Sequence, residues 1–226
     1  MKVLGIETSG NMGGIAVCEK GRCILARNFG TTLQHDKKLV STIKEVLQTI
    51  GWMPFDIDLI AVNVGPGSYT GLRIGIACAK TLAYALQKPV VDVPVFDIVA
   101  ENYDTDSIPI CPILDARRKH VYACLYISDG TQWKRQTEFL VIPPEDLLPL
   151  LPRPVIIFGD GILPYKEIFR QEKIIIEKEE WAMPKAENVA LLGQKRYLSG
   201  HRCELRAVLP LYLRKMEVLE KQEQKG

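Results

Sequence analysis

Apolar and polar positions in the first part of the chain follow two different spacings. Three short apolar runs, separated by glycine-containing turns, predict strands at residues 3–7, 13–18 and 22–28. Two short turns in succession favour an antiparallel meander of these strands. From residue 36 onward, apolar side chains recur every three or four positions, which predicts an amphipathic helix over 36–50 that ends at Gly51.

The pattern then alternates between strands and helices. We expect a fully apolar strand at 59–64, a long helix at 70–87, a strand at 90–93 and a helix at about 95–103. The order of elements in this half of the chain is therefore βββαβαβα.

The same order begins again after a polar link. The expected elements are strands at 110–115, 120–126 and 134–141, a helix at 146–151, a strand at 155–158, a helix at 164–171, a strand at 173–176 and a helix at 188–198. This duplication predicts an α/β fold of two ribonuclease-H-like lobes, the architecture of the actin, Hsp70 and hexokinase ATPases. The first lobe should span 1–104 and carry the partner-docking helices proposed below. The second should span 105–226, with the C-terminal helix and a charged tail after Arg214.

Composition narrows the class of protein. Of 226 residues, 47% are hydrophobic and 25% charged, which is typical of a globular chain. The net charge of +2 lacks the basic excess of a protein that holds nucleic acid alone, although it leaves room for RNA contacts shared with a partner. No apolar run approaches the length of about 18 residues that indicates a membrane span. Six cysteines without a C-x-x-C pair fit a reducing compartment, so we expect a cytoplasmic protein.

The residues offer few catalytic motifs. The three histidines form neither H-E-x-x-H nor H-x-x-x-H, and no G-x-S-x-G is present, so we expect no metal site. In the ATPases named above, an acidic residue after the first strand points at phosphate and metal. The corresponding turn fits that role loosely, and the alternative is a tight hairpin that needs glycine. The candidate nucleotide or anion contacts are Glu7, Thr8, Ser9, Gly67 and Ser68.

The loop at 65–75 lies between a buried strand and a helix, where α/β proteins bind anions. Its glycines do not have the G-x-G-x-x-G spacing, and no Gly-Lys-Ser/Thr follows, so it is neither a dinucleotide motif nor a P-loop. Ser68 or Thr70 can cap the helix instead. Arg73 stands in the first helical turn, where the dipole disfavours a cation, which suggests a partner anion or an intramolecular ion pair.

Small residues recur every four positions along this helix, leaving one face almost without side chains. Such a face either packs closely on the protein's own sheet or helices, or docks a second protein. We predict docking, with the helix at 36–50 as the other half of the surface. The candidate partner-binding residues are Leu39, Ile43, Val46, Thr70, Gly71, Arg73, Ile74, Gly75, Ala79 and Ala83.

The run Gly-Pro-Gly-Ser-Tyr-Thr-Gly-Leu-Arg-Ile-Gly at 65–75 resembles the hallmark of the TsaB family, also called YeaZ. Further matches follow in the family's order from end to end of the chain. They are Ile-Glu-Thr-Ser at 6–9, the single histidine ahead of the first helix (His35), Ile-Leu-Asp-Ala-Arg at 113–117, Val-Tyr at 121–122 and Pro-Leu-Tyr-Leu-Arg at 210–214.

This resemblance implies a non-catalytic subunit of the bacterial complex that adds threonylcarbamoyl to the adenosine beside the anticodon, in tRNAs reading codons that begin with A. It implies docking through the two first-lobe helices on the catalytic subunit TsaD, with the ATPase TsaE as a further partner and tRNA contacted through the complex. ATP and metal would be used by those partners, this chain would have no cofactor and no peptidase activity, and alone it would form a homodimer.

Two matters stay open at this stage. The alternative function is an independent ATP-dependent enzyme of the sugar- or acetate-kinase type. His35 suits a helix cap or an interface hydrogen bond better than a catalytic base, whereas Asp115 and Arg117 form either a solvated turn or a contact to tRNA or TsaE.

Overall fold

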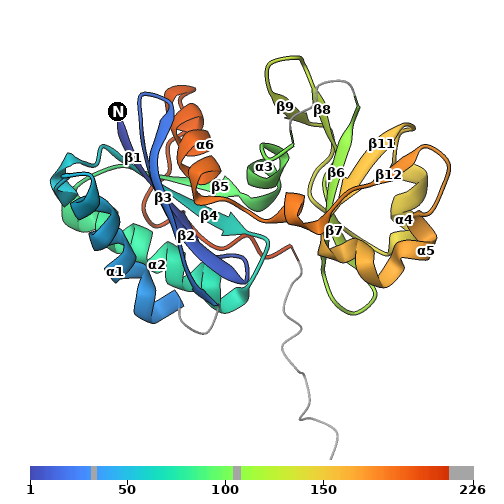
Figure 1. The fold of residues 1–226 in the computed structure, drawn as a ribbon, viewed down its shortest axis with the longest axis horizontal. Helices are drawn as coiled ribbons and strands as arrows, with labels where there is room; N and C mark the ends of the chain where they lie inside the picture. Colours follow the sequence, from blue (N-terminus) through green and yellow to red (C-terminus); the bar gives the residue numbers. More distant parts are fainter. Residues whose placement is uncertain (32–34, 104–107, 214–226) are drawn as a thin grey trace, which may run out of the picture.

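The computed structural model describes residues 1–31, 35–103 and 108–213, and it contains two α/β lobes (Figure 1). The first lobe has a sheet with the strand order β3-β2-β1-β4-β5. Its strands are β1 (Lys2–Glu7), β2 (Met12–Glu19), β3 (Arg22–Thr31), β4 (Leu59–Gly65) and β5 (Val90–Pro94). The first three form the predicted antiparallel meander, and β4 and β5 run parallel to β1.

Helices cover both faces of this sheet. On one face lie α1 (His35–Thr49) and α2 (Tyr69–Leu86), and on the other lies α6 (Ala186–Leu198), as Figure 1 shows. The short helix α3 (Val95–Ala100) leads from β5 towards the second lobe. None of the helices within the described ranges is long and apolar enough to cross a membrane.

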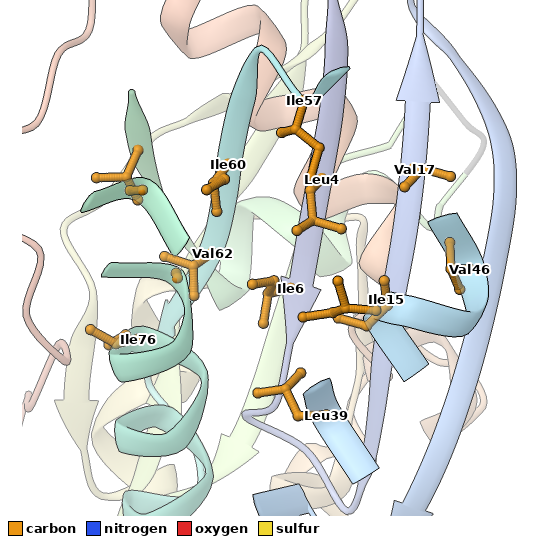
Figure 2. Close-up of a cluster of buried hydrophobic side chains, with 14 of the residues drawn as sticks. Leu4, Ile6, Ile15, Val17, Leu39, Val46, Ile57, Ile60, Val62 and Ile76 are labelled. Carbon is orange, nitrogen blue, oxygen red and sulfur yellow. The ribbon is translucent and has the colours of Figure 1, made fainter. Parts of the chain in front are cut away.

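Figure 2 shows the core between the sheet and the first pair of helices. Apolar side chains from β1, β2 and β4 meet those of α1 and α2 there, with almost no exposure to solvent. The labelled residues include Leu4, Ile6, Ile15, Leu39, Val46, Ile60, Val62 and Ile76.

The second lobe repeats the strand order of the first. Its main path is β10-β7-β6-β11-β12, which corresponds to β3-β2-β1-β4-β5. The elements are β6 (Ile110–Asp115), β7 (Val121–Ala123), β8 (Tyr126–Ser128), β9 (Trp133–Arg135), β10 (Leu140–Ile142), α4 (Pro144–Leu147), β11 (Val155–Phe158), α5 (Lys166–Phe169) and β12 (Ile174–Ile176). The duplicated two-lobe α/β fold is therefore confirmed.

Two of the expected strands are split in this lobe. The strand predicted at 120–126 breaks into β7 and β8, and between them the backbone N–H of Leu125 donates to Oγ1 of Thr137 at 3.1 Å. The strand predicted at 134–141 breaks into β9 and β10. As a result, β8 and β9 form a hairpin that leaves the main path of the sheet.

The C-terminal helix α6 was expected in the second lobe, and the structure corrects this placement. It packs on the first sheet, where glycine allows close approach: a Cβ at Gly5 would lie 2.8 Å from Cβ of Ala190. Parallel strands buried on both faces need a cover on each side, and α6 supplies the second cover of β1 and β4. The charged tail after Arg214 and the side chain of His35 lie outside the described residues.

Candidate functional site

The loop after β4 sets the start of α2. Gly65 has a φ of +101°, and a Cβ there would lie 2.7 Å from Cδ1 of Leu72, so glycine is required. Of the two predicted caps, Ser68 rather than Thr70 is the N-cap, since its Oγ accepts a hydrogen bond from the backbone N–H of Gly71 at 3.2 Å. The loop therefore fixes both the direction and the first turn of α2.

A buried network joins the end of β1 to β4. Oε1 of Glu7 accepts hydrogen bonds from the backbone N–H of Ser9 at 2.5 Å and from its Oγ at 2.7 Å. Oε2 of Glu7 accepts from Nδ2 of Asn63 at 2.5 Å, and Oδ1 of Asn63 accepts from the N–H of Gly65 at 2.8 Å. Burial raises the pKa of Glu7 above its ordinary value of 4.5, although the bonds from Asn63 and Ser9 act in the opposite direction.

This network corrects the expected nucleotide site. Glu7, Thr8 and Ser9 are buried, and both oxygens of the Glu7 carboxylate already accept bonds from within the lobe. Of the five candidate residues, only Gly67 and Ser68 reach the surface, and the N–H of Ser68 already donates to the carbonyl of Ser9 at 2.8 Å. The turn therefore holds β1 against the loop before α2 rather than presenting an acid to solvent.

The small-residue face of α2 also points inward. Gly71 lies against the carbonyl of Thr8, and Gly75 lies so close to the Thr8 side chain that an added Cβ would overlap with Oγ1. Ala79 and Ala83 are buried as well. The prediction that these four residues contact a partner is therefore wrong for this fold, because the face is occupied by the protein's own sheet.

The same correction applies to the predicted residues of α1. Leu39, Ile43 and Val46 are buried in the core that α1 shares with the sheet. Among the candidate partner-binding residues, Thr70 and Arg73 are exposed and Ile74 is half-buried.

The outward face of α2 carries a second stripe that sequence analysis missed. Arg73, Ala77, Thr81 and Ala85 also recur every four positions, and all four are exposed. The signal was present in the sequence, two positions away from the glycines. Beyond Arg73 the side chains of this stripe are short, which lets another backbone approach closely.

Residues 201–213, which we call the C-terminal strap, follow α6 and cross the first lobe to lie beside this stripe. Nζ of Lys80 donates to the carbonyl of Val208 at 3.3 Å, and the N–H of Leu211 donates to the carbonyl of Val64 at 2.7 Å. The side chain of Val208 is buried in the first-lobe core. The strap is thus anchored along α2 by backbone and side-chain contacts.

Arg73 is held by two tyrosines where the strap meets the start of α2. Its Nε donates to the hydroxyl of Tyr212 at 3.0 Å, which raises the pKa of Arg73, and its guanidinium lies 3.9 Å from the ring centroid of Tyr69. The two tyrosine rings stack with centroids 5.3 Å apart. Within the described residues, the intramolecular partners of Arg73 are therefore aromatic.

The outward stripe and the strap border a groove of about 610 Å³. Apolar side chains form much of its lining, and Arg73 and Lys80 add positive charge. The lining residues are Arg73, Ile76, Ala77, Lys80, Thr81, Val208, Leu209, Pro210 and Tyr212. The groove can take a segment that presents a small apolar surface with an acidic group beside it.

Asp115 and Arg117 pair with each other in the turn after β6. Oδ1 of Asp115 accepts from the N–H of Arg117 at 2.7 Å, and its Oδ2 lies 3.0 Å from Nη1 of Arg117. Asp160 accepts from the N–H of Asp115 at 2.9 Å. These bonds hold Asp115 against Arg117 and Asp160, and the side chain of Arg117 remains 86% exposed.

Comparison with known proteins places this chain in a family. The family model described as "TsaD: tRNA N6-adenosine threonylcarbamoyltransferase" matches residues 31–222, so the chain belongs to that class of proteins. The TsaB protein of Bacillus subtilis (strain 168), a tRNA threonylcarbamoyladenosine biosynthesis protein, is 30% identical over 228 residues, with 96% of each chain covered. TsaB of Escherichia coli (strain K12) is 24% identical over 220 residues, with 95% of each covered.

A solved structure agrees with these relatives. YeaZ from Pseudomonas aeruginosa superposes with a TM-score of 0.80 at 26% identity, covering 93% of this chain and 100% of that one. The chain thus belongs to the TsaB (YeaZ) family of tRNA threonylcarbamoyladenosine biosynthesis proteins, which confirms the resemblance seen in the sequence.

The inward packing of Gly75 gives a stability test. We expect Gly75→Leu to lower the free energy of unfolding by about 1–3 kcal/mol, because the new side chain collides with Thr8, the residue that follows β1. The matched control is Ala77→Leu, which places the same leucine side chain on the exposed face of the same helix and should change stability by less than about 0.5 kcal/mol. Urea denaturation measures both, and equal effects would contradict the assigned orientation of α2.

The buried Glu7 gives a pH test. Because its pKa is raised in the folded state, its contribution to stability is present below pH 4.5 and is lost as the pH rises through the folded pKa. Relative to Glu7→Gln, wild-type stability should fall with rising pH, by about 1.4 kcal/mol per unit of pKa shift. Urea denaturation between pH 4.5 and 8 measures this difference. Glu45→Gln, at an exposed position of α1, should run parallel to wild type, and a pH-independent difference for Glu7→Gln would refute the assignment.

Proposed function

We propose that this chain is a non-catalytic subunit that docks on a TsaD-like catalytic protein and supports threonylcarbamoylation of the adenosine beside the anticodon, in tRNAs reading codons that begin with A. The observation that carries the proposal is the groove between the outward stripe of α2 and the C-terminal strap. Three of its lining residues, Arg73, Pro210 and Tyr212, lie in two of the segments that resemble the family's motifs, 65–75 and 210–214.

The composition of the groove suits a protein partner. Ala77 and Thr81 leave room for a partner helix to approach the backbone of α2. Arginine and tyrosine dominate binding energies when they are central in an interface, and Tyr69, Arg73 and Tyr212 already form a preorganised cluster here. Preorganisation lowers the entropy cost of docking.

Exposed apolar side chains extend this surface over the layer of α1 and α2. Val40 on α1 is 65% exposed and Tyr84 on α2 is 70% exposed. Apolar groups in such positions are common at interfaces. The docking surface we propose therefore includes both first-lobe helices through their outward faces, not through the buried residues chosen from the sequence.

In this proposal the chemistry belongs to the partners. ATP is used by a TsaE-like ATPase, metal and substrate are held by the TsaD-like subunit, and tRNA is contacted through the assembled complex in the cytoplasm. This chain binds and positions the catalytic subunit, and it has no peptidase activity of its own.

The alternative is an independent ATP-dependent enzyme of the sugar- or acetate-kinase type. The burial of Glu7 weighs against it, because that carboxylate already accepts bonds from Ser9 and Asn63. ATP hydrolysis by the purified chain alone distinguishes the two: turnover that scales with the concentration of this chain and persists through purification would favour the kinase.

A charge placed in the groove tests docking. We expect Ala77→Glu to weaken binding to the TsaD-type protein of the same genome at least tenfold, because a longer charged side chain fills the stripe. Isothermal titration measures the affinity, and tRNA modification by the reconstituted system should fall in parallel. The control is Leu198→Glu, which places the same charge at an exposed site of α6 on the opposite face of the sheet. Loss of binding in the control alone would move the interface to that face.

The same surface predicts the behaviour of the chain alone. We expect a symmetric homodimer that covers the outward faces of α1 and α2 until TsaD replaces it. Light scattering at tens of micromolar should show a dimer for wild type and a monomer for Ala77→Glu. A wild-type monomer, or a dimer that binds TsaD without dissociating, would contradict the shared surface.

A further inference from the structure

Three side chains with metal-binding atoms meet where the C-terminal strap begins. Asp92 lies on β5, and His201 and Cys203 follow α6. Oδ1 of Asp92 lies 2.6 Å from Nε2 of His201 and 3.2 Å from Sγ of Cys203, and these last two atoms are 3.3 Å apart. All three side chains are half-buried, so the cluster remains open to an incoming ion.

The triangle of donor atoms has nearly the size that a metal ion needs. Zinc binds nitrogen and oxygen at about 2.0–2.2 Å and sulfur at about 2.3 Å, which places tetrahedral ligand atoms about 3.4 Å apart. The Asp92–His201 edge must therefore open by less than about 1 Å, and the other two edges by a few tenths of an ångström. Sequence motifs could not reveal the site, because Asp92 stands 109 residues before His201.

We propose that Asp92, His201 and Cys203 bind a divalent transition ion of the zinc class, with water in the fourth position. Oxygen, imidazole nitrogen and thiolate together suit zinc better than magnesium or calcium, which prefer oxygen ligands alone. On binding, the Cys203 thiol and Nε2 of His201 give up to solvent any proton that they carry, and the metal takes the place of those protons.

Arg196 would compete with the ion for Asp92 and His201. Its Nη2 lies 3.4 Å from Oδ1 of Asp92 and 3.2 Å from Nε2 of His201, so it supplies positive charge to the metal-free cluster. Its Nη1 lies 3.8 Å from Oδ2 of Asp97, a second anionic partner that it keeps when the metal neutralises Asp92. Removing Arg196 should therefore tighten metal binding rather than abolish it.

The ion would fasten the strap to β5. The strap carries Tyr212, which holds Arg73 at the edge of the groove. Metal binding would thus stabilise one wall of that groove, but the site itself rests on the cluster alone and stands whether or not the groove binds a TsaD-like protein.

Cobalt substitution tests the site directly. The full chain, stripped with a chelator and titrated with Co²⁺, should bind one ion and show a thiolate-to-cobalt charge-transfer band. Cys203→Ser should remove the band, and Asp92→Asn should weaken affinity at least tenfold, whereas Arg196→Gln should strengthen it. The matched control is Cys23→Ser, which removes an exposed cysteine outside the cluster and should leave the band unchanged.

A second readout follows the strap itself. Arg202 and Arg206 are exposed, so trypsin should cut the strap more slowly after zinc is added to wild type, and at an unchanged rate in Cys203→Ser. The absence of a charge-transfer band in wild type would overturn the proposal without depending on the folding of any variant. A band that survives in Cys203→Ser but disappears in Cys23→Ser would also overturn it.

Discussion

The close approach of α2 to the end of β1 is the contact on which the first lobe depends. Gly71 and Gly75 let the helix backbone lie against Thr8, and the buried bonds of Glu7 to Ser9 and Asn63 hold that turn in place. Any larger residue at these glycines would push α2 outward and open the core beneath it. Because this contact sets which face of α2 points toward the sheet, the helix geometry determines which side chains face solvent. The exposed stripe that begins at Arg73 is the result.

The first lobe is completed by the end of the chain rather than by its first half. Helix α6 covers the face of the sheet opposite α1 and α2, and the C-terminal strap then crosses to the outer side of α2. Residues 186–213 therefore belong structurally to the lobe that begins at Met1. This arrangement places Tyr212 beside Arg73, so the groove is built from segments more than a hundred residues apart. The groove therefore keeps its shape only while the C-terminal strap is packed along α2.

The sequence predicted the order of elements in the first lobe, the meander and a helix cap at Ser68 or Thr70, because each is encoded within a few neighbouring residues. It misassigned the faces of α2. A four-residue period predicts a stripe along one face of a helix but does not show which way that face points. Two such stripes run along α2, and only the one with the glycines is small enough to lie against Thr8. The placement of α6 and the meeting of Asp92 with His201 depend on long-range packing, for which a single sequence carries no local signal.

The two lobes share a strand order, but the acidic residue at the end of the first strand has a different environment in each lobe. Glu7 is buried and accepts bonds from Ser9 and Asn63, whereas the Asp115 side chain is 19% exposed and pairs with Arg117 across its own turn. A carboxylate that positions phosphate or metal must keep an oxygen available to its ligand. Hydrogen bonds and an ion pair within each lobe already occupy the oxygens of Glu7 and Asp115. The two lobes therefore keep the duplicated architecture, but their acidic turns stabilise the fold. In the function that we propose, the chain therefore contributes to the reaction through the surface on α2 and the strap.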